Sequence, residues 1–146
     1  KAPEQISFLL RKVSEPRVRI MSRETAHAEM KRILGQVPGF FEGLPDDTID
    51  DEWELFKRFE LGETAIPAKY RELIGLGIAS VLHCWYCSNF HSAMAQFHGA
   101  SAAEVQEVVH IAKFTAGWST YLSGSLYDRD RFIKELQEIG EHLSQV

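Results

Sequence analysis

The residues best suited to chemistry are two cysteines and a histidine that lie close together in the sequence. Cys84 and Cys87 are the only cysteines of the chain, and His91 follows Cys87 by four residues. Two thiols three residues apart close a very small loop, so a disulfide between them would restrict the unfolded chain little. We therefore interpret the pair as a local redox centre that cycles between dithiol and disulfide.

Cys87 is the candidate nucleophile of this pair. In a helix, residues three and four apart share a face, so Cys87 would contact both Cys84 and His91. A free thiol with a pKa near 8.5 is only about 3% thiolate at pH 7, and a hydrogen-bonded imidazole could raise that fraction. A helix start favours the first thiol instead, but Cys84 would lie about 10 Å from His91 along the axis. We assign Cys87 as nucleophile, Cys84 as resolving thiol and His91 as base.

The same separation argues against a zinc site made from Cys84, Cys87 and His91, because zinc ligands lie about 2.0–2.3 Å from one ion. A zinc or iron site that combines two of them with His83, His98 or a neighbouring chain remains an alternative. Two buried cysteines beside a core histidine are a further alternative. The leading interpretation requires no metal and no cofactor.

Glu72 is the expected partner of His91. It lies in an apolar stretch, where burial of a carboxylate is costly. If the chain reverses near His83, Glu72 lies about 16 Å before the turn and His91 about 12 Å after it, so antiparallel helices would set them level. A carboxylate there would orient the imidazole and raise its basicity. The alternative is that Glu72 pairs with Lys69, Arg71 or solvent on an exposed stripe.

Composition limits the class of protein. The chain has 146 residues, 45% of them hydrophobic and 25% charged, which predicts one globular domain over residues 1–146. A net charge of −5 argues against a nucleic-acid partner, although basic residues near the start should form a solvated arm or contact a partner subunit: Lys1, Arg11, Lys12, Arg17 and Arg19. The uncharged stretch from Leu73 to Phe90 is interrupted by polar residues and glycines, so no membrane span is expected. No secretory signal pattern opens the chain, and the cytoplasm is the expected compartment, since it suits a regenerable thiol pair.

The residue patterns indicate an all-α, single-domain helical bundle, with strand-like alternation scarce beyond Arg17–Ile20. The expected helices run from the Ser22 cap to just before Gly35, then over Trp53–Leu61, Pro67–Leu82, Cys84–Phe97, Ala102–Ala116, a short segment Trp118–Leu126, and Asp128–Leu143. Ser101 and Glu104 have the spacing of a capping box. Gly75-Leu76-Gly77 lacks the preceding strand and third glycine of a nucleotide-binding loop, and indicates close helix packing. The apolar late helices favour self-association.

Taken together, Glu72, Cys84, Cys87 and His91 resemble the motif of the alkylhydroperoxidase D-like branch of the carboxymuconolactone decarboxylase superfamily. That motif is a Glu, eleven residues, a Cys, two residues, a Cys, three residues and a His, and the chain matches every spacing. The similarity covers about residues 67–116. The chain departs from the founding peroxidase at Tyr86, where that enzyme has a further histidine.

The resemblance implies an all-helical, AhpD-like fold that forms trimers, or hexamers built from dimers. It also implies a hydroperoxide reductase in which Cys87 becomes a sulfenic acid, Cys84 condenses with it, and a lipoyl-protein or thioredoxin-like donor restores the dithiol. A thiol–disulfide oxidoreductase or redox sensor without peroxidase turnover is the alternative. A metal-binding protein and a decarboxylase-like enzyme are weaker alternatives. The decarboxylase is the weakest of them, because decarboxylase members generally lack the cysteine pair.

Overall fold

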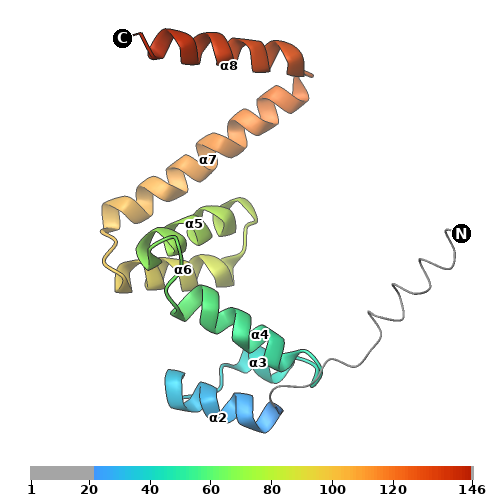
Figure 1. Ribbon diagram of the computed structural model, residues 1–146, viewed down its shortest axis with the longest axis vertical. Coiled ribbons are helices and arrows are strands. Elements are labelled where there is room, and N and C mark those ends of the chain that lie inside the picture. The colour runs from blue at the N-terminus through green and yellow to red at the C-terminus, as the bar shows by residue number, and fades with distance from the viewer. Residues whose placement is uncertain (1–21, 146) are drawn as a thin grey trace, which may run out of the picture. The chain divides into compact units, whose positions relative to one another are not determined.

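The computed structural model describes residues 22–145, and all regular structure in this part of the chain is helical (Figure 1). The elements are α2 (Arg23–Leu34), α3 (Gly39–Glu42), α4 (Ile49–Phe56), the π-helical turn η1 (Lys57–Leu61), α5 (Ala68–Val81), α6 (Trp85–Phe97), α7 (Ala102–Gly124) and α8 (Arg129–Leu143). The all-α prediction is therefore confirmed. The basic residues near the start and the Arg17–Ile20 run lie outside the described residues.

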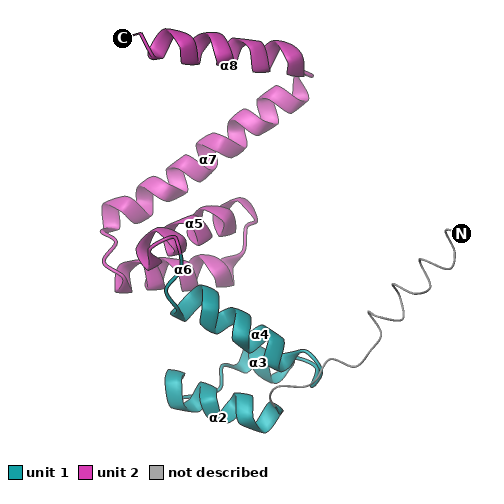
Figure 2. Cartoon of the chain, viewed as in Figure 1, with its two compact units in different colours: residues 1–64 teal, residues 65–146 magenta. Residues whose placement is uncertain are grey.

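The chain divides into two compact units, residues 1–64 and 65–146 (Figure 2). A single domain over residues 1–146 stays a prediction, and each unit is described by itself. None of the helices in the described part of the chain combines the length and apolar character that crossing a membrane requires.

The first unit is built around a small aromatic core. Its buried side chains are Ala26, Met30, Phe41, Ile49 and Trp53. The helix predicted after Ser22 is present: the Ser22 side chain accepts the Thr25 N–H, and Gly35 ends the helix with a φ of 79°. The helix predicted to begin at Trp53 begins at Ile49 instead, because Asp50, Asp51 and Glu52 occupy its first turn, where the helix dipole favours acidic residues.

The second unit contains a helical hairpin, α5 and α6, joined by a very short turn. Helix α5 ends in a Schellman motif, in which the Cys84 N–H donates to the Ala79 carbonyl and the His83 N–H to the Ser80 carbonyl. His83 takes the left-handed position with a φ of 55°, which usually belongs to glycine. Cys84 then serves as the N-cap of α6. The hairpin turn thus places the first cysteine where one helix has just ended and the next begins.

Helix α7 follows the hairpin and is one continuous helix. The capping box is present, since Ser101 Oγ accepts the Glu104 N–H at 3.1 Å and a Glu104 carboxylate oxygen accepts the Ser101 N–H at 2.8 Å. The predicted break between Ala116 and Trp118 is wrong. Gly117 costs a helix about 1 kcal/mol relative to alanine, which is too little to end one without a cap or a proline.

Asp128 caps the start of helix α8, where a helix was predicted to begin, and its carboxylate accepts the Arg131 N–H at 2.7 Å. None of its residues is buried. Its apolar side chains recur at intervals of four, three and four residues and remain exposed: Phe132, Leu136, Ile139 and Leu143. This spacing marks one face of a helix, and that face has no cover within the described residues.

Candidate functional site

The two cysteines are joined in the structure by a disulfide, and their Cα atoms are 5.4 Å apart. Cys84 is half-buried and Cys87 is exposed. Cys84 Sγ accepts the backbone N–H of Cys87 at 3.2 Å, so the sulfur acts as the cap of the helix that carries Cys87. A helix N-terminus stabilises negative charge. The geometry therefore favours a thiolate on Cys84 whenever the disulfide opens.

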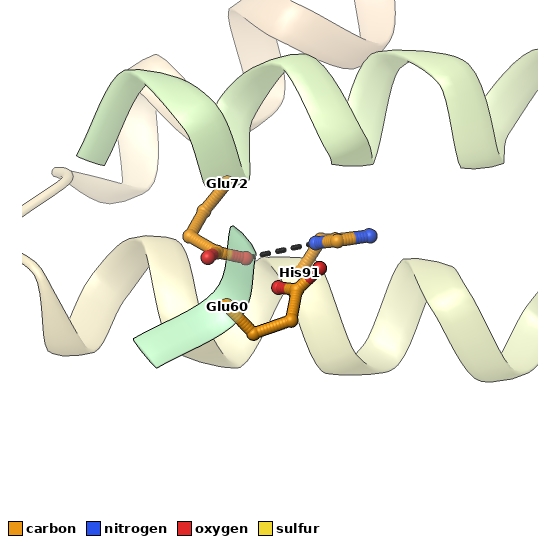
Figure 3. A group of neighbouring side chains, drawn as sticks. All are labelled: Glu60, Glu72 and His91. Atoms are coloured by element: carbon orange, nitrogen blue, oxygen red, sulfur yellow. Dashed lines mark hydrogen bonds and ion pairs between the residues drawn. The ribbon is translucent and has the colours of Figure 1, made fainter. Parts of the chain in front are cut away.

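Glu72 and His91 meet across the α5–α6 hairpin within one chain (Figure 3). His91 Nδ1 lies 2.8 Å from Glu72 Oε2. The Glu72 side chain is 0% exposed and the His91 side chain 19% exposed. An ionised carboxylate can only accept a hydrogen bond, so beside an ionised Glu72 a neutral His91 carries its hydrogen on Nδ1 and keeps a lone pair on Nε2. This arrangement orients the imidazole and leaves one nitrogen free to take a proton.

The other oxygen of Glu72 has an uncommon environment. Among the described residues, Glu72 Oε1 is buried and has no hydrogen-bond partner. A buried carboxylate depends strongly on the few partners it has, because water cannot replace them. His91 is therefore an important stabilising contact for Glu72, as well as being positioned by it.

Gly75 brings the imidazole close to α5. It lies one helical turn after Glu72, and a Cβ atom placed on it would fall 2.6 Å from both Cε1 and Nδ1 of His91. The ring thus occupies space that any other residue at this position would fill. The sequence predicted close packing around Gly75, but it did not reveal that the neighbour is the candidate base.

An ion pair between Lys69 and Glu104 connects the hairpin to α7. Lys69 Nζ donates to Glu104 Oε1 at 2.7 Å. This bond, followed by the hydrogen bonds from Ser101, lowers the pKa of Glu104 to about 2. Glu104 is therefore ionised at neutral pH, and this partly exposed pair secures the end of α5 nearest Glu72.

The opposite side of α5 faces a groove along α7. The groove has a volume of about 710 Å³ and walls that are almost entirely apolar. Its lining includes Tyr70, Ile74, Ile78, Val81, Val108 and Ile111. It contains none of the four predicted site residues.

The remaining candidates stand apart from this arrangement. His83, His110 and His142 are exposed, and His98 caps the end of α6. Tyr86 is 80% exposed and stacks edge-on against Trp85, with ring centroids 5.4 Å apart. In the described part of the chain, neither cysteine belongs to a group of three or more side chains arranged to hold a metal ion.

Comparison with known proteins identifies the family of this chain. The model of the Carboxymuconolactone decarboxylase family matches residues 51–126, which is more than half of the chain. The chain belongs to this family. The residues of this family member that match the model include Glu72, both cysteines and His91. No curated protein matches the chain.

A solved structure supports the fold of this family member. The alkylhydroperoxidase AhpD core from Rhodospirillum rubrum ATCC 11170 is similar, with a TM-score of 0.65 and 24% sequence identity. The similarity covers 75% of this chain and 84% of that one. The AhpD-like fold within the carboxymuconolactone decarboxylase superfamily is thereby confirmed.

Proposed function

We propose that this protein is a thiol-dependent alkylhydroperoxide reductase with Cys87 as the nucleophile. The observation that supports this most is the buried Glu72 carboxylate bonded to His91 Nδ1, in a helix where Cys87 lies one turn before that histidine. Nucleophile, base and orienting group form the arrangement that activates nucleophiles in many enzymes. Cys87 is also the more exposed of the two cysteines, which favours it as the sulfur that meets a peroxide.

The first step oxidises Cys87. His91 Nε2 accepts the thiol proton, and the thiolate attacks the terminal oxygen of the hydroperoxide. The O–O bond breaks as the S–O bond forms, so Cys87 becomes a sulfenic acid. The alkoxide takes up the proton from His91 and leaves as an alcohol.

The second step forms the disulfide. The Cys84 thiol attacks the sulfenic sulfur, hydroxide leaves with a proton as water, and the two sulfurs join. A reduced dithiol donor, such as a dihydrolipoyl group or a thioredoxin-like protein, then attacks the exposed Cys87 sulfur. Cys84 leaves as a thiolate, which the Cys87 N–H stabilises, and a mixed disulfide joins the donor to Cys87. The second thiol of the donor then attacks the donor sulfur of this bond, Cys87 leaves as a thiolate, and the donor becomes a disulfide. The two protons released by the donor restore both thiols. The cycle requires no bound cofactor and suits a reducing compartment such as the cytoplasm.

We further propose that the protein self-associates through α7 and α8. The face of α7 that carries Ile111, Phe114, Trp118 and Tyr121 is exposed, as is the apolar face of α8. Exposed apolar patches of this extent mark interaction surfaces. A second copy of the chain offers the same two faces, and isologous packing of α7 and α8 would bury both.

A thiol–disulfide oxidoreductase or redox sensor is the second candidate. It is favoured by Tyr86, which replaces a histidine of the founding peroxidase and leaves an exposed aromatic pair beside the disulfide. This function would use the same sulfurs, with a protein disulfide in place of the peroxide.

The proposed function is tested by titrating fully reduced, metal-free protein with hydrogen peroxide and with an organic hydroperoxide. Thiol loss and intact mass are followed in the wild type, Cys84→Ser and Cys87→Ser. We expect rapid conversion of the wild type to a disulfide, a trappable sulfenic acid in Cys84→Ser, and no rapid reaction in Cys87→Ser. If the wild type reacts no faster than a small free thiol, the peroxidase proposal is wrong. Exchange with a protein disulfide would then support the second candidate.

A further inference from the structure

We propose that Gly75 is a positioning residue for His91. Its missing side chain lets the imidazole lie against α5, where Glu72 can hold Nδ1 and leave Nε2 directed away from the carboxylate. The inference rests on the proposed function only for the role of Nε2 toward Cys87. The positioning itself is a property of the hairpin.

The evidence is the space around the ring. A Cβ on Gly75 would lie 2.6 Å from Cε1, 2.6 Å from Nδ1 and 2.8 Å from Cγ of His91. Such separations do not occur between non-bonded atoms, so either the ring or one of the helices would have to move. The atom that makes the hydrogen bond to Glu72 is among the atoms displaced.

Movement of the ring would affect the Glu72 carboxylate, which has few other hydrogen-bond partners. Glu72 is fully buried, and its second oxygen has no partner among the described residues. A displaced His91 would leave that carboxylate without its hydrogen bond and would lose the tautomer that the bond fixes. Glu72 and Gly75, three residues apart on one face of α5, therefore act together: one holds the ring and the other makes room for it.

Gly77 provides a matched comparison on the same helix. A Cβ there would have Val108 Cγ1 at 3.5 Å as its nearest neighbour, which is ordinary van der Waals contact. Both glycines lie inside α5, where alanine is the better helix former. Helix propensity alone therefore predicts the same gain from alanine at either position, whereas positioning of His91 predicts opposite outcomes.

The experiment compares Gly75→Ala with Gly77→Ala in the full chain. The alkylation rate of reduced Cys87 by iodoacetamide is measured against pH in the Cys84→Ser background, and the His91 tautomer is read from its imidazole ¹⁵N shifts. We expect Gly75→Ala to slow alkylation near neutral pH about tenfold to a hundredfold, to move its pH midpoint upward and to remove the Nδ1–H signature. Gly77→Ala should leave all three unchanged.

A second measurement distinguishes a clash with the His91 ring from a general folding defect. In the background Glu72→Gln/His91→Ala, which removes the ring and the buried charge, Gly75→Ala should raise the urea midpoint of unfolding, whereas in the wild type it should lower it. The proposal is overturned if Gly75→Ala keeps the Nδ1–H signature and the wild-type pH profile, or if it lowers the midpoint equally in both backgrounds. Failure of the peroxidase proposal is distinguishable, because neither readout uses a peroxide.

Discussion

The α5–α6 hairpin and the α7–α8 segment break the usual rule of burial in opposite directions. The hairpin buries a carboxylate completely, whereas α8 leaves its whole apolar face in solvent. In the hairpin, the buried group has a specific partner, His91, and a glycine that makes room for that partner. In α8, the described residues offer no cover for the exposed face. The first exception points to the proposed active site, and the second to the proposed self-association.

The largest effect should come from breaking the buried pair. His91→Ala leaves Glu72 fully buried without its hydrogen bond, which we expect to lower the free energy of unfolding by about 3 kcal/mol. Urea denaturation of the reduced protein measures this change. Glu72→Gln serves as the comparison, because it removes the buried charge but keeps the shape and should cost less. Equal losses in the two variants would show that the pair contributes nothing beyond packing.

An intermediate effect should come from placing a charge on the apolar face of α8. Leu136→Glu removes the burial of one leucine in each subunit, worth about 1.5–3 kcal/mol, so self-association should weaken about tenfold to a hundredfold for each leucine lost. Sedimentation equilibrium measures it, with Gln137→Glu on the polar side of the same helix as the matched control. Unchanged association in Leu136→Glu would mean that this face packs against something other than a second copy.

The smallest effect should come from the partly exposed pair that connects the hairpin to α7. The pKa of Glu104 is lowered from 4.5 to about 2 by the hydrogen bond from Lys69 and those from Ser101. A lowered pKa means that the ionised form stabilises the fold above about pH 4.5, and that this contribution disappears as the pH falls toward 2. Between these pH values, the free energy of unfolding should therefore depend less on pH in Glu104→Gln than in the wild type. A wild-type slope in that variant would assign the acid sensitivity to other carboxylates.

Much of the fold followed from local signals. Ser22, Gly35, Ser101 with Glu104, and Asp128 each mark a helix end that the structure contains, because capping depends only on residues within one turn. The juxtaposition of Glu72 and His91 also followed, since the length of two helices around a short turn sets their level.

Other features of the fold were not predicted. The continuity of α7 through Gly117 contradicted the predicted break, because a single glycine weakens a helix without ending it. The early start of α4 at Ile49 and the π-helical turn after Phe56 were likewise missed. The contact between Gly75 and the His91 ring depends on how closely two helices approach, and a sequence read by periodicity does not contain that distance.

Cys84 completes the Schellman turn of α5 and caps α6, so no flexible linker separates the redox chemistry from the backbone. A thiolate accepts a hydrogen bond more strongly than a disulfide sulfur. Opening and closing of the disulfide, as in the proposed function, would therefore also change how strongly the first turn of α6 is capped. The Cys87 amide donates to that sulfur, so its hydrogen exchange with solvent should differ between the oxidised and the reduced protein.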